Sequence, residues 1–200
     1  MNNYIFKDRD GSTPLESEQL KGIRFPHITT MGELDEVEDE NIGRGLDWLN
    51  RQKPNDYLSI NFLNELHRKL FDDVWKWAGK YRIRDVNLSK ISPYEIGHEL
   101  KLLFDNTKAQ IYYKSMPWDE IVAEFHHKLV SIHPYPNGNG RMARIMTEYL
   151  QKRNNQKITS WMGSLANSPK ERRKKYIQAL VAADSGDYST LIEFMKEKQK

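Results

Sequence analysis

The residues best suited to chemistry lie at positions 131–150, in the stretch SIHPYPNGNGRMARIMTEYL. Four small residues, at positions 137–140, follow two prolines and lead into an amphipathic segment with helical spacing. Glycines let the backbone approach a ligand closely and adopt positive φ. The first amides of a helix have no partner within the helix, so they point outward and can bind an anion. This stretch therefore predicts a cradle for phosphate groups.

Three side chains flank this cradle. Arg141 and Arg144 are three residues apart, so they share one helical face, where guanidinium groups can fork onto phosphate oxygens. His133 lies just upstream, where an imidazole can act as a base on a group that attacks the phosphate. Taken singly, a His-Pro turn, an NGNG loop and two arginines are ordinary surface features. Their combination within twelve residues indicates a phosphate site with a candidate base.

The spacing of apolar residues predicts the helices that must position this loop. We expect helices over residues 31–52, from Asp56 or Ser59 to a stop at Gly79, and over 93–113, 118–132, 139–153, 169–183 and 188–198. Residues 81–91 break the helical rhythm and predict a short, imperfect hairpin. The first 28 residues carry Pro14, Gly22 and Pro26 and predict an arm lying on the domain. The expected fold class is all-α with one small β-hairpin.

Composition narrows the classes of partner. Hydrophobic residues make up 38% and charged residues 30% of the 200 residues, as in soluble globular proteins. No run approaches the roughly 20 apolar residues that cross a bilayer, and the N-terminus does not resemble a secretory signal. The absence of cysteine excludes disulfides and fits a reducing cytosol. We interpret the basic run KERRKK as a solvated helix face. We therefore expect a cytoplasmic protein without a membrane or nucleic-acid partner.

The loop also carries a family resemblance. Residues 133–144, HPYPNGNGRMAR, resemble the signature of the Fic family, HPFx(D/E)GNGRxxR, and residues 75–82, WKWAGKYR, resemble the segment leading into that family's flap. The resemblance covers about residues 58–195, and in detail it is closest to the bacterial mobile mystery protein B branch. It implies a Fic-type helical domain with a β-hairpin flap at residues 58–200, preceded by an arm and a helix at residues 1–57.

The resemblance implies a protein adenylyltransferase, which moves AMP from ATP to a Ser, Thr or Tyr hydroxyl of a target protein. His133 would remove the hydroxyl proton. The phosphates of ATP, bound with Mg²⁺, would be held by Asn137, Gly138, Asn139, Gly140, Arg141 and Arg144. The target's backbone would pair with the flap at Val86, Asn87, Leu88 and Ser89. An antitoxin-like partner protein is a further expectation, with this chain as the toxin of the pair.

Two loop residues depart from the family signature. Tyr135 replaces phenylalanine, and Asn137 replaces the acidic residue that holds Mg²⁺ in the family. An amide oxygen can still ligate Mg²⁺, so Asn137 stays the candidate metal ligand, although it lacks the negative charge that hard cations favour. This departure leaves two alternatives open. One is the transfer of another phosphate-containing group, and the other is a catalytically weak, nucleotide-binding regulatory protein.

Many Fic proteins are inhibited by a helix with the motif [S/T]xxxE[G/N], whose glutamate pairs with the second arginine of the loop. Glu40 and Asn41 match the end of that motif, but Glu36 stands where serine or threonine belongs. Glu33 fits the first part of the motif, which then fails at Leu34. Glu40 is therefore the inhibitory candidate, with a solvated acidic helix face as the alternative.

The remaining histidines receive no catalytic assignment from the sequence. His126 and His127 precede the loop on an amphipathic helix, and we expect them to be structural. His27, His67 and His98 are scattered, without the spacing of metal ligands.

Overall fold

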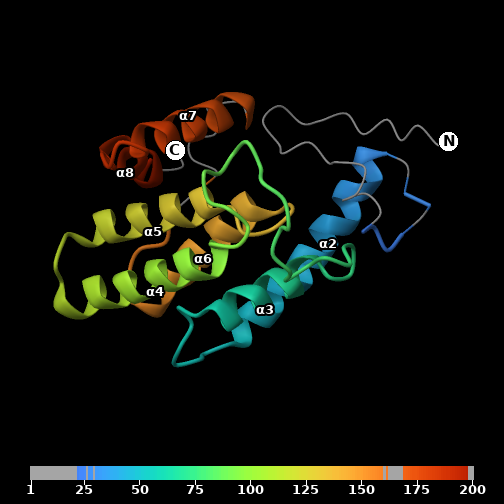
Figure 1. Ribbon diagram of the computed structural model, residues 1–200, viewed down its shortest axis with the longest axis horizontal. Helices are drawn as coiled ribbons and strands as arrows, with labels where there is room; N and C mark the ends of the chain where they lie inside the picture. The colour runs from blue at the N-terminus through green and yellow to red at the C-terminus, as the bar shows by residue number, and fades with distance from the viewer. Residues whose placement is uncertain (1–21, 26, 29, 160, 162–168, 198–200) are drawn as a thin grey trace. The chain divides into compact units, whose positions relative to one another are not determined.

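The computed structural model describes residues 22–25, 27–28, 30–159, 161 and 169–197. These residues form α-helices (Figure 1), namely α2 (Met31–Arg51), α3 (Ile60–Phe71), α4 (Ile96–Tyr113), α5 (Trp118–Ile132), α6 (Asn139–Arg153), α7 (Pro169–Ala183) and α8 (Ser189–Lys196). No strand occurs in them, apart from one isolated bridge between Ile23 and Trp75. The predicted all-α class is confirmed. The expectation for the first 21 residues of the arm lies outside the described part of the chain.

The chain divides into two compact units, which we describe separately. The first contains residues 1–98 and 133–142, and the second contains residues 99–132 and 143–200. The loop of interest belongs to the first unit.

Helix α2 starts with a complete capping box, in which Thr30 and Glu33 exchange backbone–side chain hydrogen bonds of 3.1 and 3.3 Å. Such a box satisfies two of the amide donors at the N-terminus of a helix. Ser59 caps α3 in a similar way by accepting a hydrogen bond from the Phe62 amide (3.3 Å). Both helix starts therefore agree with the sequence-based expectation.

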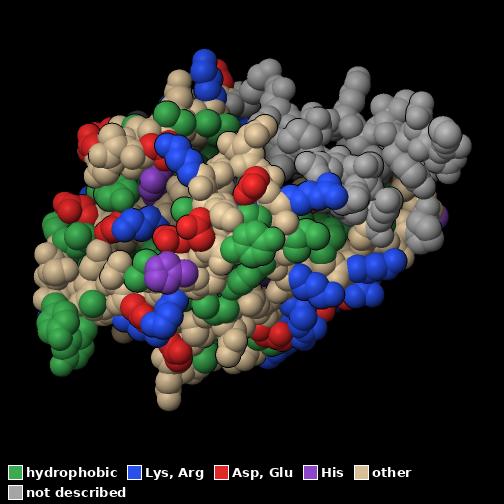
Figure 2. Space-filling view, in the orientation of Figure 1, with side chains coloured by type: hydrophobic (Ala, Val, Ile, Leu, Met, Phe, Trp, Pro, Cys, Tyr) green, Lys and Arg blue, Asp and Glu red, His purple; other side chains and the backbone are tan. Residues whose placement is uncertain are grey.

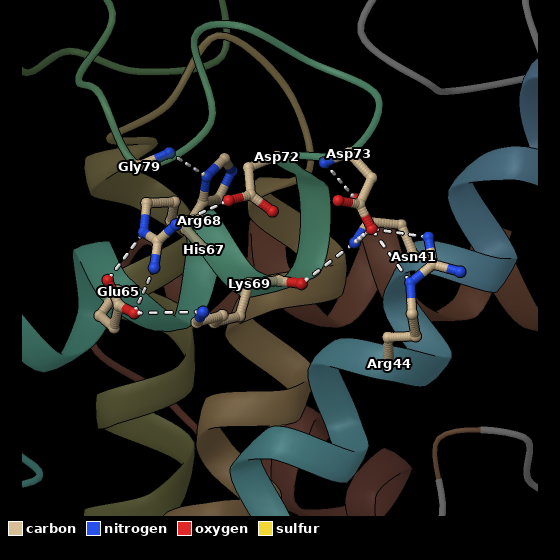
Figure 3. A network of polar contacts seen from close by, with 9 residues as sticks. All are labelled: Asn41, Arg44, Glu65, His67, Arg68, Lys69, Asp72, Asp73 and Gly79. Carbon is tan, nitrogen blue, oxygen red and sulfur yellow. Dashed lines mark hydrogen bonds and ion pairs between the residues drawn. The ribbon is translucent and has the colours of Figure 1, made fainter.

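Helices α2 and α3 pack closely in the first unit. At Gly45 a Cβ atom would lie only 2.8 Å from the Leu70 side chain and the Lys69 carbonyl oxygen, so glycine permits the close approach. Asn41 fixes the register, because its amide donates to the Lys69 carbonyl (3.2 Å) and accepts from the Asp73 amide (3.1 Å). Figure 3 shows this polar network beside the Arg44–Asp73 ion pair of 2.6 Å.

Helix α3 ends at Phe71, eight residues before the predicted stop at Gly79. The following residues pair with the N-terminal segment instead. The backbone amide of Arg24 donates to the Val74 carbonyl (2.9 Å), and the backbone amide of Lys76 donates to the Gly22 carbonyl (2.8 Å). Val74 is buried and Trp77 is half-buried, and both continue the spacing of apolar residues beyond Phe71. The apolar pattern alone therefore predicted a helix that is too long.

The predicted hairpin at residues 81–91 is not formed, since these residues adopt bends and turns. The side chain of Arg82 supplies the reason. Its guanidinium donates to the carbonyl oxygens of Arg84 and Ile91, which lie seven residues apart in this segment. A buried side chain, rather than a ladder between strands, therefore satisfies these backbone acceptors.

The second unit has its own apolar core between α5, α7 and α8. Its buried members are Val122, Ala123, Ala179, Ala183, Leu191, Phe194 and Met195. His126 is fully buried near this core and bonds to Thr147 Oγ1 and Tyr176 Oη (both 2.9 Å). His127 bonds to Asp184 Oδ1 (2.9 Å). Both histidines hold helices together, as the sequence predicts.

Helices α5, α6 and α7 have the predicted bounds. Within the part of the chain that the structure describes, no helix combines the length and apolarity needed to cross a bilayer. Figure 2 shows acidic and basic side chains interspersed over the visible face.

Candidate active site

The loop before α6 is anchored by the buried side chains of Tyr135 and Asn139. The Tyr135 amide donates to Asn139 Oδ1 (2.9 Å), and Asn139 Nδ2 donates to the Tyr135 carbonyl (2.7 Å). The Tyr135 hydroxyl donates to Asn64 Oδ1 of α3 (2.7 Å), and burial holds the pKa of this phenol well above its ordinary value. The side chain of Asn139 therefore shapes the loop, and any contact it makes with phosphate comes from its backbone amide.

His67 on α3 contacts the same loop through a hydrogen bond and a stacked ring. The Gly79 amide donates to His67 Nδ1 (2.9 Å; Figure 3), which places the ring proton on Nε2. That nitrogen donates to the Asn137 carbonyl (3.1 Å). The ring also stacks on Tyr135 with 3.7 Å between centroids. Complete burial, with the charge of Arg141 nearby, lowers the pKa of His67 to about 3, so the ring is neutral near pH 7.

Sequence reasoning missed this role of His67. The signal was its place on the inward stripe of α3, among the buried residues Leu63, Leu66 and Leu70. A histidine on such a stripe must find polar partners in the interior.

The loop predicted to cradle phosphate contains a glycine in the left-handed region. Gly138 has φ +78°, and a Cβ atom there would lie 2.7 Å from the Phe71 ring, so only glycine fits. The Met142 amide is bonded back to the Gly138 carbonyl (2.9 Å). The amides of Asn139, Gly140 and Arg141 precede that first bond, and such amides at a helix start point toward a bound anion.

His133 begins the loop and is 7% exposed. Its backbone has φ +51°, in the left-handed region that residues other than glycine seldom adopt. Its carbonyl oxygen accepts a hydrogen bond of 2.8 Å from Arg82 Nε. The candidate base therefore has a constrained backbone.

Arg141 is paired with a carboxylate of α2. Its Nη1 lies 2.6 Å from Glu38 Oε2, and the guanidinium carbon lies 4.9 Å from the centroid of the Phe71 ring. The other carboxylate oxygen of Glu38 accepts a 2.6 Å hydrogen bond from the Trp75 indole. Glu38 is 6% exposed. The structure thus brings a buried acidic group to the first arginine of the loop.

Glu40, the inhibitory candidate from the sequence, lies elsewhere. Its side chain is 71% exposed and forms an ion pair with Arg44 on the same helix. Glu33, the other candidate, belongs to the capping box of α2. The acidic side chain of α2 that reaches the loop is Glu38, which the family motif did not indicate.

Arg144 lies in the second unit, so we describe it separately from Arg141. Its guanidinium carbon is 5.9 Å from the centroid of the Tyr176 ring. Burial and the nearby charge of Arg144 lower the pKa of His126 to about 3.

The residues expected to form the flap lie on an irregular surface segment. Asn87 and Leu88 are exposed, whereas Val86 and Ser89 are partly buried. The Ser89 amide bonds to the Val86 carbonyl (3.2 Å), which closes a turn.

Among the described residues, no group of three or more histidine or acidic side chains lies together in a way that could hold a metal ion. Asn137 Oδ1, the expected metal ligand, accepts a 2.6 Å hydrogen bond from the Gly138 amide.

The sequence of the chain is similar to that of known proteins. The model of the Fic/DOC family matches residues 57–151. The protein adenylyltransferase fic-1 of Caenorhabditis briggsae is 28% identical over 141 residues, which cover 69% of this chain and 26% of that protein. The probable protein adenylyltransferase y4lH of Sinorhizobium fredii is 27% identical over 176 residues, which cover 82% of this chain and 84% of that protein.

Solved structures share the fold. BepC of Bartonella tribocorum, a VirB-translocated effector protein with bound AMPPNP, has a TM-score of 0.69 and 19% identity, with 99% of this chain and 98% of that chain covered. The N-terminal FIC domain of Bep8 from Bartonella sp. 1-1C has a TM-score of 0.67 and 16% identity, with 89% and 94% covered. The chain is therefore similar to the Fic/DOC family over residues 57–151. It spans about a quarter of the length of the C. briggsae relative, at 26%.

Proposed function

We propose that this chain is a protein adenylyltransferase that moves AMP from ATP to a hydroxyl group of a target protein. The observation that carries the proposal is that His133 begins a loop which the mutual hydrogen bonds of Tyr135 and Asn139 hold in place at the start of α6. The names of the two curated relatives support the same activity.

In the proposed reaction His133 accepts the proton of a Ser, Thr or Tyr hydroxyl as its oxygen attacks the α-phosphorus of ATP. The bond from that phosphorus to the α,β-bridging oxygen breaks, and pyrophosphate leaves. The amides of Asn139, Gly140 and Arg141 and the guanidinium of Arg141 stabilise the charge on the phosphates. Arg144 is proposed to assist at the leaving pyrophosphate. Mg²⁺ would accompany ATP as part of the substrate, and Asn137 is the residue that would ligate it, through an uncharged amide oxygen.

The target-binding part of the proposal concerns the segment Val86 to Ser89. Although this segment is irregular, an exposed stretch can gain a strand partner when an extended peptide binds. A cytosolic location, an antitoxin-like partner, the mobile mystery protein B branch and a domain boundary near residue 57 accompany the proposal as expectations from the sequence.

The test uses ATP labelled at either the α- or the γ-phosphate, incubated with the protein alone and with a bacterial lysate. AMP transfer predicts protein-bound label from α-labelled ATP only. His133→Ala should lower this labelling by roughly 10²- to 10⁴-fold, since general-base catalysis contributes about that much. His98→Ala, at an exposed histidine of α4, is the matched control.

Other outcomes separate the alternatives. Label from the γ-phosphate would indicate phosphoryl transfer. ATP binding without any transfer by the wild-type protein would indicate a regulatory nucleotide-binding protein. Equal labelling by wild type and His133→Ala would remove His133 from the mechanism.

A further inference from the structure

Arg82 is a buried arginine whose hydrogen bonds end on the backbone around His133. It is only 4% exposed. Its Nε donates to the His133 carbonyl (2.8 Å), and its own backbone amide donates to the Pro134 carbonyl (2.9 Å). Arg82 therefore holds two consecutive carbonyl groups at the start of the loop.

These two hydrogen bonds matter because of the backbone conformation of His133. At φ +51° the residue sits in a region that side chains other than glycine disfavour, and such conformations persist only where the surroundings hold them. Arg82 binds the carbonyl oxygen of His133 and that of the next residue, Pro134. The direction of the imidazole follows from that backbone.

The same guanidinium also reaches the segment expected to bind the target. Nη1 donates to the Arg84 carbonyl (2.8 Å), and Nη2 donates to the Ile91 carbonyl. These carbonyls bracket residues 86–89. One buried side chain thus anchors both the candidate base and the two ends of the candidate target-binding segment.

We propose that Arg82 is a positioning residue, which holds His133 in its left-handed conformation and keeps the imidazole aligned with the hydroxyl of a target bound at Val86 to Ser89. The proposal rests on the function proposed above. It concerns Arg82 acting through His133, and Arg82 itself touches no reacting atom.

The chemistry of the side chain favours this role for arginine over lysine. A guanidinium is planar and presents five N–H donors in a fixed fork, so it can reach carbonyl groups in separate directions. A lysine ammonium carries the same charge on a single nitrogen, at the end of a side chain that reaches less far. Burial lowers the pKa of Arg82, and Asp85 opposes that effect.

The first experiment compares Arg82→Lys with Arg51→Lys, a matched change at an exposed arginine at the end of α2. We expect Arg82→Lys to lower kcat about 10- to 100-fold, the loss that follows from misplacing a catalytic group by about 1 Å. The Kd for ATP should change less than about twofold, because Tyr135, Asn139 and His67 hold the phosphate loop independently. Arg51→Lys should match wild type.

A double variant separates positioning from general support. If Arg82 acts through His133, then Arg82→Lys should cost little further activity in a His133→Ala background, since coupled residues are non-additive. An equal loss of activity in both backgrounds would overturn the proposal. So would an unchanged kcat in Arg82→Lys.

Two further measurements cover failure of folding and failure of the proposed function. Guanidinium ion should restore kcat in Arg82→Ala but not in His133→Ala. If both Arg82 variants melt below the assay temperature and guanidinium restores neither folding nor kcat, Arg82 is a general structural support and the proposal is wrong.

The three-bond HN–Hα coupling of His133, measured by NMR without ATP, should change in Arg82→Lys. An unchanged coupling overturns the inference, whereas lack of label transfer by wild type overturns only the proposed reaction.

Discussion

Glu38 and Arg141 lie 103 positions apart in the chain, and their side chains form a part-buried ion pair of 2.6 Å. This contact connects α2 to the start of α6. A guanidinium engaged by a carboxylate is less available to phosphate, because the two anions compete for the same donors. If ATP binds at this arginine, we expect Glu38 to compete with its phosphates for the guanidinium.

Glu38→Gln should raise the affinity for ATP by about 10- to 100-fold, which corresponds to roughly 1.4 to 2.8 kcal/mol. The substitution removes the competing charge, and the glutamine oxygen can still accept the hydrogen bond from Trp75. Isothermal titration calorimetry measures the effect. Glu40→Gln is the matched control, on the same helix but exposed and paired with Arg44. An effect of Glu40→Gln alone would restore the assignment made from the family motif.

Gly138→Ala should destabilise the fold by about 2–4 kcal/mol, because an alanine at positive φ is strained and its methyl group meets the Phe71 ring. Gly140→Ala is the matched control, since a Cβ there meets nothing within 4 Å. It should leave the free energy of unfolding unchanged or slightly higher, because alanine favours helix. Denaturant titration of both variants provides the comparison. Equal stabilities would show that the loop does not require glycine at position 138.

His67 should make stability depend on pH in mildly acidic solution. Its pKa is about 3 in the folded protein, against an ordinary value of 6.5, so between those values the unfolded chain binds more protons. Stability is therefore lost as the pH falls from about 6.5 toward 3, by up to about 1.4 kcal/mol per pH unit for each such histidine. Protonation would also turn Nδ1 from an acceptor into a donor facing the Gly79 amide.

The pH prediction is checked by denaturant unfolding between pH 7.5 and 4.5. His67→Gln should flatten the decline in unfolding free energy, whereas His98→Gln, at an exposed position, should leave it unchanged. Identical slopes for wild type and His67→Gln would contradict the assignment. His126, whose pKa is also lowered to about 3, contributes to the decline that remains.

Asn137→Asp should weaken ATP binding without Mg²⁺ and strengthen it with Mg²⁺. A carboxylate can still accept from the Gly138 amide, but it repels bare phosphates and attracts a divalent cation. Calorimetric titrations with and without Mg²⁺ measure both effects. Asn87→Asp, at an exposed residue, controls for net charge. If the affinity of Asn137→Asp for ATP shows no added dependence on Mg²⁺, Asn137 serves only the loop.

The sequence predicted the helices around the loop well, since prolines and glycines punctuate a clear apolar period there. It failed where tertiary contacts decided the outcome. The bridge of Ile23 to Trp75 ended α3 early, and Arg82 replaced the expected hairpin bonds.

Glu38 was missed because the run ELDEVEDEN offers many carboxylates. Its helical phase distinguishes it, because the buried positions of α2 are Leu34, Glu38, Asn41, Gly45 and Leu49. These recur at spacings of three and four, as one helix face requires.

The close packing at Gly45 bears on how the molecule can be shortened. The range matched by the family model, residues 57–151, excludes α2. Trimming the chain to that range would expose the side of Leu70 that Gly45 covers, although Leu70 is fully buried in the whole protein. It would also release Arg141 from Glu38. Exposed leucines favour aggregation, so minimal fragments for crystallisation or labelling should begin before α2 and retain Gly22 to Arg24, which pair with the residues around Trp75.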